Sequence, residues 1–136
     1  MPISPAQIWK GSNFSIDRME GKTPRTVIFR LTGPFTARDM YNTLTPANMK
    51  DMFEHQPWPG EAPPSLNIFD LSGVPYMDSM GLGMMVTQYV RCQGKGIRMI
   101  ATGVTPRVLE VFKLTKVSTI IPMAASVEEA EAAVSH

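Results

Sequence analysis

The residues best suited to chemistry in this sequence stand in one short run, Asp78-Ser79-Met80-Gly81-Leu82-Gly83. An Asp-Ser pair that follows an apolar segment and a turn predicts the start of a helix. The first turn of a helix has unpaired N–H groups and the positive end of the helix dipole. Gly81 and Gly83 leave space there for another backbone or a phosphate. A serine hydroxyl in this position suits a helix cap, a nucleophile or a phosphorylation site, and the residue types alone leave all three open.

Several catalytic and ligand-binding patterns are similar to this run but incomplete. The stretch 77–81 lacks the first glycine of a hydrolase nucleophile elbow, and the only downstream histidine is His136. Gly81-Leu82-Gly83 lacks the third glycine of a dinucleotide-binding loop, and Gly94-Lys95-Gly96 is not a Walker A sequence. Two distant histidines and the single Cys92 predict no metal site. We therefore expect neither enzymatic activity nor a cofactor.

The composition argues against several other classes of protein. The chain has 136 residues, which suits one domain with one core, and its net charge of +1 gives no basic stripe for a nucleic acid. No apolar stretch approaches the roughly 20 residues that a membrane helix needs, and the N-terminus lacks the pattern of a signal peptide. A single cysteine fits a reducing compartment. We expect a soluble cytoplasmic protein that binds neither nucleic acid nor membrane.

Alternating and apolar segments predict the elements that must hold residues 78–83 in place. The expected strands are an antiparallel hairpin of 13–20 and 25–32, buried strands at 66–71 and 97–102, and a short extended piece at 118–122. The expected helices are 37–54 after Thr36 with a break at Pro46, 80–93, 106–114 after Thr105, and one opened by a capping box at 126–129. Residues 55–65 hold four prolines and predict a loop. This order of elements indicates an α/β sheet with right-handed crossovers.

The stretch 67–83 resembles the STAS family, the domain that sulfate transporters share with anti-sigma factor antagonists. The family pattern is a strand with Asp-Leu, a short turn and Asp-Ser-Ser-Gly-Leu-Gly, and it occurs here as Asp70-Leu71 followed by residues 78–83. The likeness continues at 96–100, 105–108 and 126–130, and so covers roughly 25–134, with 1–12 as an N-terminal extension. It implies a single STAS domain over residues 1–136. The implied fold is a central mixed β-sheet with an N-terminal antiparallel hairpin and helices packed mainly on one side.

The resemblance also implies a function for the serine of the motif. In the antagonists, that serine is phosphorylated by a partner anti-sigma factor that is also a kinase, and the unphosphorylated form binds this partner and frees a sigma factor. Ser79 is then the phosphorylation site of a bacterial transcription regulator, and Asp78 positions its hydroxyl or contacts the kinase. The implied partners are an anti-sigma serine kinase of the histidine-kinase-like ATPase type and a serine phosphatase. The alternative is a STAS scaffold or accessory subunit, in a stressosome-like assembly or beside a lipid-transport ATPase, whose Ser79 is never modified.

The helix that begins near Ser79 predicts a surface for the partner. Four apolar residues supply a core-facing stripe at helical spacing: Leu82, Met85, Val86 and Tyr89. That stripe leaves Met80, Met84 and Gln88 on a different face, and methionine recurs on surfaces that must fit a partner. The predicted partner-binding residues are Asp78, Ser79, Met80, Gly81, Gly83, Met84 and Gln88. The chain is expected to be a monomer or a weak homodimer.

Overall fold

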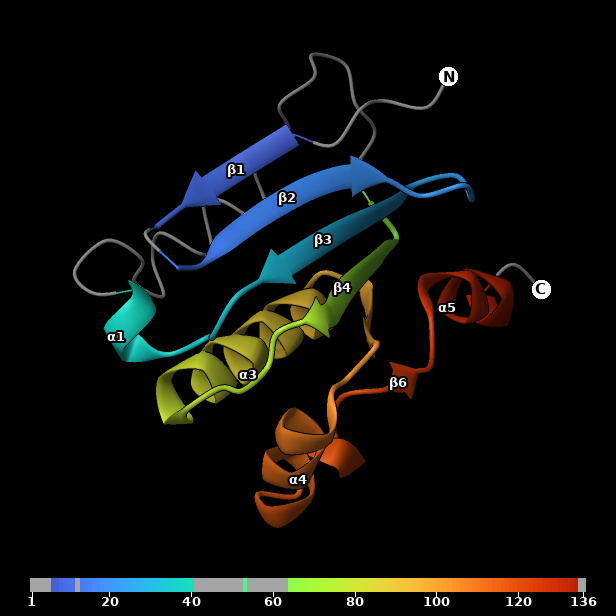
Figure 1. Ribbon diagram of the computed structural model, residues 1–136. Helices are drawn as coiled ribbons and strands as arrows, with labels where there is room; N and C mark the ends of the chain where they lie inside the picture. The colour runs from blue at the N-terminus through green and yellow to red at the C-terminus, as the bar shows by residue number, and fades with distance from the viewer. Residues whose placement is uncertain (1–5, 12, 41–52, 54–63, 135–136) are drawn as a thin grey trace.

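The antiparallel hairpin predicted near the N-terminus belongs to one half of a six-stranded sheet (Figure 1). The computed structural model describes residues 6–11, 13–40, 53 and 64–134. β2 (Ser15–Glu20) and β3 (Thr26–Thr32) pair antiparallel, which confirms the hairpin. The sequence did not predict β1 (Ala6–Lys10), which pairs antiparallel with β2 at the edge of the sheet.

The other half of the sheet is parallel. β4 (Leu66–Gly73) pairs with β3, β5 (Arg98–Thr102) with β4, and the short β6 (Met123–Ala124) with β5. Parallel neighbours need a crossover connection, and α3 (Ser79–Gly94) and α4 (Pro106–Leu114) supply two of them. The predicted mixed sheet with an N-terminal antiparallel hairpin is therefore confirmed.

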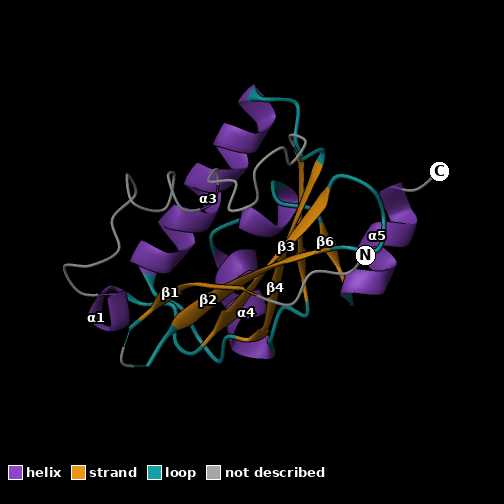
Figure 2. Cartoon of the chain, turned by 90° about the horizontal axis from the view of Figure 1, so that it is seen from above, coloured by secondary structure: helices purple, strands orange, loops and turns teal. Residues whose placement is uncertain are grey.

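Apolar layers lie on both faces of this sheet. The larger layer, which includes Phe29 and Phe69, packs against α1 (Ala37–Met40), α3 and α4. The smaller layer, which includes Ile28, lies beneath α5 (Val127–Val134). Figure 2 shows α3 on one side of the strands and α5 on the other. The helices thus pack mainly on one side of the sheet, as the resemblance implies.

The remaining expectations have mixed outcomes. The helices predicted at 80–93 and 106–114 are confirmed as α3 and α4. The helix expected over 37–54 begins as α1, but the predicted break at Pro46 and most of the loop 55–65 lie outside the described residues. The prediction of an extended piece at 118–122 is wrong. Lys116 has a φ of 64°, which ends the preceding helical region, and a 3₁₀ turn, η1 (Val117–Thr119), follows it. None of the described helices is long and apolar enough to cross a lipid bilayer.

Candidate functional site

The carboxylate of Asp78 holds the start of α3 in place. Its Oδ1 accepts hydrogen bonds from the backbone N–H groups of Met80 at 3.0 Å and Gly81 at 3.1 Å, which caps the helix. Its Oδ2 accepts from the N–H of Ala37, the first residue of α1, at 2.9 Å. Asp78 therefore bonds to the first turns of two helices. Asp78 is the N-cap of α3, so the reading of Ser79 as the cap is wrong.

Ser79 is the first residue of α3 and lies on the surface. The helix start expected at Asp78-Ser79 is thus confirmed, and Ser79 is an exposed residue of its first turn. Because Asp78 supplies the side-chain cap, the hydroxyl is not needed to hold the helix start. The hydroxyl is therefore free to make other contacts without loss of the cap.

The turn before α3 is joined to the segment that leads into α1. Phe35 donates its N–H to the carbonyl of Tyr76 at 3.1 Å, its own carbonyl accepts from the N–H of Asp78 at 3.4 Å, and it forms an isolated bridge with Met77. Gly81 packs against the same backbone, and a Cβ at Gly81 would lie 2.1 Å from the carbonyl oxygen of Phe35. Only a glycine allows this approach, which fixes the rotation of α3 about its own axis.

That rotation turns three of the predicted partner-binding residues inward. Met84 and Gln88 are each 3% exposed and Gly81 is buried, so the expectation that they lie on a partner surface is wrong. The buried stripe of α3 consists of Gly81, Met84, Met85, Gln88 and Cys92. Its spacing is helical, but the polar Gln88 conceals it in the sequence. In the interior, Nε2 of Gln88 donates to Sγ of Cys92 at 3.6 Å.

The accessible surface around Ser79 comes from its neighbours in the turn and in two helices. Met80 is 43% exposed, and Gly83 is exposed with no atom within 4 Å of where a Cβ would lie. Tyr76 is 38% exposed, and the guanidinium of Arg107 lies over its ring, 4.8 Å from the centroid. We call these five residues, Tyr76, Ser79, Met80, Gly83 and Arg107, the Ser79 surface.

The sequence pattern did not single out Tyr76 or Arg107 as site residues. The contact between Tyr76 and Arg107 follows from the topology. α3 and α4 each begin after a parallel strand, so both helices start at the carboxyl ends of the strands. The N-cap position of Thr105 was the available signal, since it places Arg107 in the first turn of α4. Thr105 does not cap with its side chain; its hydroxyl donates to the carbonyl of Val74 at 2.7 Å and ties α4 to the turn before α3.

The described residues bring no group of histidine, cysteine or acidic side chains together that could hold a metal ion. The site consists of an accessible hydroxyl, apolar side chains and one cation stacked on an aromatic ring. Such a set is suited to recognition of a protein surface.

Comparison with known proteins identifies the fold. A family model for the STAS domain matches residues 19–130. A putative anti-sigma factor antagonist from Thermotoga maritima has a TM-score of 0.69 at 19% identity, over 89% of this chain and 95% of that one. An anti-sigma factor antagonist from Mycobacterium paratuberculosis has a TM-score of 0.66 at 19% identity, over 90% and 96% of the two chains. A sulfate transporter family protein from Wolinella succinogenes has a TM-score of 0.65 at 16% identity, over 82% and 85%.

These identities are low, so the similar structures establish the fold and no more. The curated protein sequences give no match. The family model, however, covers most of the chain, including both the strand that carries Asp70-Leu71 and the start of α3. The chain belongs to the STAS domain family.

Proposed function

We propose that this protein is an anti-sigma factor antagonist that acts by binding and not by catalysis. With Ser79 unphosphorylated, it binds an anti-sigma factor that is also a serine kinase, and so releases a sigma factor in the bacterial cytoplasm. Phosphorylation of Ser79 ends the binding, and a serine phosphatase restores it. The observation that carries the proposal is the exposed hydroxyl of Ser79 beside a cap that Asp78 supplies. Two antagonist structures with this fold support it.

The Ser79 surface supplies the contacts that such a partner needs. Tyr76 and Met80 are exposed large side chains close to Ser79 in the sequence. Gly83 has open space where a side chain would stand, so the backbone of a partner can approach α3 closely. Aromatic and arginine side chains that become buried when a complex forms contribute a large share of its binding energy, and the exposed Tyr76 and Arg107 are residues of these two types.

The charge of a phosphate at Ser79 sets the sign of the switch. It would add about −1.5 to −2 charges beside Asp78. A free helix N-terminus would offset this by about 0.3–1 kcal/mol per charge. However, Asp78 already accepts hydrogen bonds from the N–H groups of Met80 and Gly81. Fewer free N–H groups therefore remain at the start of α3 to stabilise a phosphate.

Docking increases the repulsion because it removes water from the phosphate. Two like charges about 4 Å apart repel by roughly 1 kcal/mol in water and by about 4 kcal/mol at the effective dielectric constant of a protein surface. We expect binding to weaken by a few kcal/mol, which is on the order of a hundredfold in Kd. The free domain should stay folded, since Ser79 is on the surface and outside the cap.

Calorimetric titration against the anti-sigma kinase tests the proposal. The kinase is first captured from native lysate, and mass spectrometry establishes whether Ser79 carries a phosphate. Ser79→Ala should bind as tightly as the unmodified chain, whereas phosphorylated Ser79 and Ser79→Glu should bind more weakly. Gln93→Glu is the matched control, because it adds one negative charge at the exposed far end of the same helix. Equal affinities of all forms would reject phosphorylation-controlled binding.

A second candidate is a STAS scaffold or accessory subunit that binds without modification of Ser79. A sulfate transporter family protein with the same fold supports keeping this candidate, because the fold is not confined to antagonists. A stressosome-like assembly or a lipid-transport ATPase complex would be its setting. This candidate predicts that Ser79→Glu and Ser79→Ala bind equally well, so the same titration separates the two functions.

A further inference from the structure

The Ser79 surface is too small to hold a protein partner by itself. It has five residues, whereas a stable protein–protein interface usually has about 20–30 residues on each side. A partner that docks on Ser79 must therefore contact a neighbouring surface as well. Exposed large apolar side chains indicate where, because such side chains stabilise a complex that buries them.

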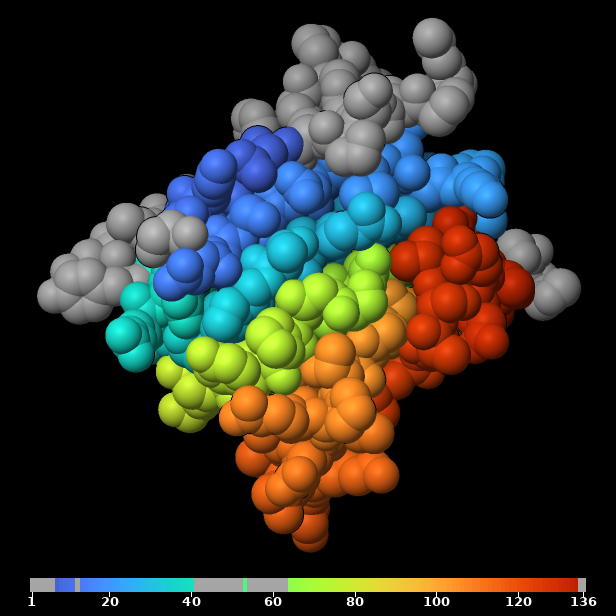
Figure 3. Space-filling model, in the orientation of Figure 1, coloured from blue at the N-terminus to red at the C-terminus, as the bar shows by residue number. Residues whose placement is uncertain are grey.

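Two such side chains lie at the end of α4 and in the turn that follows it. Leu114, the last residue of α4, is 76% exposed, and Ile120, which follows η1, is 46% exposed. α4 and η1 contact each other, and in Figure 3 the orange part of the chain that contains them stands out from the rest of the molecule. We call residues 106–120 the α4–η1 projection. We propose that the anti-sigma kinase also binds this projection, through a segment with acidic and large apolar side chains; this inference rests on the proposed function.

α4 connects the Ser79 surface to the exposed leucine. Arg107, a member of the Ser79 surface, lies in the first turn of α4, and Leu114 comes seven residues later. Side chains seven residues apart lie on nearly the same face of a helix, about 10 Å apart along its axis. The half-buried Val111 lies between them on this face. A partner that covers Arg107 can therefore reach Leu114 along one face of α4.

The charge of the projection favours an acidic partner segment. Its charged residues are all exposed: Arg107, Glu110, Lys113 and Lys116. Three cations against one acid give a formal charge of +2, whereas the whole chain carries +1. Glu110 stands three residues before Lys113, a spacing at which two side chains are neighbours on a helix. The excess positive charge therefore lies at Arg107 and Lys116, at the two ends of α4, where acidic side chains of a partner would be complementary.

Lys116 stands in a strained backbone position. Its φ is 64°, in the left-handed region that glycine adopts without steric cost and lysine seldom adopts. Its N–H donates to the carbonyl of Lys113 at 3.1 Å, and its carbonyl accepts from the N–H of Thr119 at 3.1 Å. The next residue, Val117, is buried, whereas Lys116 is exposed. Strain at an exposed residue where glycine would fit without cost supports a role for the lysine side chain.

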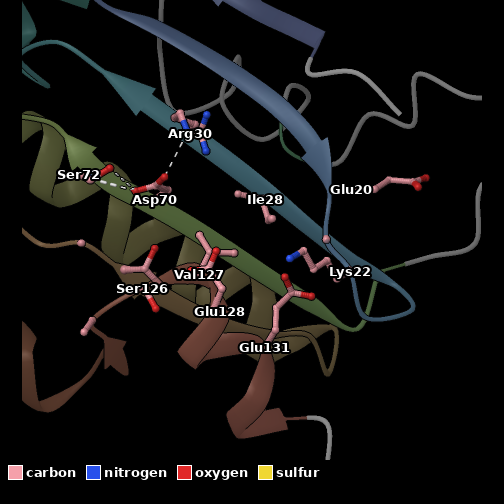
Figure 4. A pocket seen from close by; sticks show the side chains of 14 residues that line it. Glu20, Lys22, Ile28, Arg30, Asp70, Ser72, Ser126, Val127, Glu128 and Glu131 are labelled. Carbon is pink, nitrogen blue, oxygen red and sulfur yellow. Dashed lines mark hydrogen bonds and ion pairs between the residues drawn. The ribbon is translucent and has the colours of Figure 1, made fainter. Parts of the chain in front are cut away.

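The opposite face of the sheet is less suited to an acidic segment. α4 packs on the face that carries α3, and α5 covers part of the other face. A hollow of about 410 Å³ lies beside α5 on that other face. Figure 4 shows Glu128 and Glu131 of α5 at this hollow. These carboxylates would repel the acidic side chains that the projection attracts.

Two other occupants of the projection fit its charge less well. If the same face of a second copy packed on it, Lys113 and Lys116 would meet lysines, and like charges across an interface disfavour binding. Attraction to an anionic lipid surface usually involves clusters of about four to eight cations. The projection has three cations and one acid. A protein segment with acidic side chains is therefore the occupant that the charges favour.

Calorimetric titration of surface variants against the anti-sigma kinase tests the proposal. Leu114→Ala should weaken binding about tenfold, because it removes an apolar side chain that the complex buries. Lys116→Gly should weaken binding about two- to fivefold, and this loss should shrink as salt is added. The same variant should raise the midpoint of urea denaturation, because glycine adopts a φ of 64° without strain. Weaker binding by a more stable protein cannot result from loss of the fold.

Two matched controls remove similar side chains elsewhere. Val90→Ala shortens an apolar side chain that is 62% exposed on α3, outside the projection. Lys10→Gln removes an exposed lysine from β1, which lies at the opposite edge of the sheet from β6. Both controls should leave the affinity unchanged. A loss of affinity in Val90→Ala but not in Leu114→Ala would overturn the proposal, because the partner would then extend along α3.

The titration distinguishes failure of this inference from failure of the proposed function. If Leu114→Ala and Lys116→Gly bind as tightly as the unmodified chain while phosphorylated Ser79 binds weakly, the projection is overturned and the switch stands. If both variants bind weakly while all Ser79 forms bind equally, the projection is supported and the switch is rejected. A kinase that binds no form overturns both.

The other occupants are tested without the kinase. Sedimentation velocity measures self-association, and flotation with vesicles of phosphatidylserine and phosphatidylcholine measures lipid binding. We expect a monomer at micromolar concentration and no protein on the vesicles. A dimer or a vesicle-bound protein that Leu114→Ala abolishes would overturn the proposal.

Discussion

Replacing Gly81 and Gly83 by alanine, one at a time, should change the stability of the protein in opposite directions. Both glycines lie near the start of α3, so the helix propensity of alanine favours each replacement by about 0.5–1 kcal/mol. At Gly83 nothing opposes this gain, because a Cβ would have no atom within 4 Å. Gly83→Ala should therefore raise the free energy of unfolding by about 0.5–1 kcal/mol.

At Gly81 the added methyl group meets backbone. Its Cβ would lie 2.1 Å from the carbonyl oxygen of Phe35 and 3.1 Å from both the carbonyl carbon and Cγ of that residue. No side-chain rotation can relieve a contact with a carbonyl oxygen, so α3 must move away from the segment before α1. Overpacking of this kind costs about 1–3 kcal/mol, occasionally more. The propensity gain is common to both variants, so the two should differ in stability by this same amount.

Urea denaturation followed by far-UV circular dichroism measures the difference. If the two variants have the same slope m, the difference between their midpoints multiplied by m is the difference in their free energies of unfolding. The unmodified chain should fall between the variants, with Gly83→Ala the most stable. Equal midpoints for Gly81→Ala and Gly83→Ala would refute the rotation assigned to α3, and with it the burial of Met84 and Gln88.

Four other substitutions probe the site and its support. Met84→Lys should lower the free energy of unfolding by several kcal/mol because it buries an unpaired charge, whereas Met80→Lys should change it by less than about 0.5 kcal/mol and weaken partner binding. Thermal denaturation and partner titration distinguish the two, and equal destabilisation would contradict the assigned faces. Asp78→Ala should cost at least about 1 kcal/mol and speed amide exchange at the start of α1, since one carboxylate serves both helices. Glu131→Ala should cost about 1–3 kcal/mol by removing the acceptor for Thr23, and unchanged exchange in α5 would argue against this tether.

Most of the sheet could be predicted because its central strands are continuous apolar runs or regular alternations. β1 could not, because its register shifts between Gln7 and Trp9 and the period of two is broken there. β6 has only two residues, and so short a strand leaves no pattern to detect. The neighbouring η1 depends on the left-handed conformation of Lys116. Lysine seldom adopts this conformation, so the sequence does not predict the turn.

The candidate site was predictable where local rules decide it. A helix start at Asp78-Ser79 follows from capping chemistry, although the pattern could not say which of the two residues is the cap. The face that α3 buries depends on the contact between Gly81 and Phe35, which are far apart in the chain. The stacking of Arg107 on Tyr76 is also a tertiary contact. Hydrophobic spacing along one helix contains neither piece of information.

The order of the strands also determines how this protein can assemble during its synthesis. Strand order in the sheet equals order in the chain, so each strand that leaves the ribosome finds its hydrogen-bonding neighbour already made. No strand has to insert between two older ones. Strand pairing can thus follow synthesis, but the covering of the smaller apolar layer cannot. Its residues Ile28, Ile68 and Ile100 stay uncovered until α5, the last helix, has emerged. The nascent sheet therefore carries an apolar strip until α5 covers it, and such transiently exposed surface is what chaperones bind.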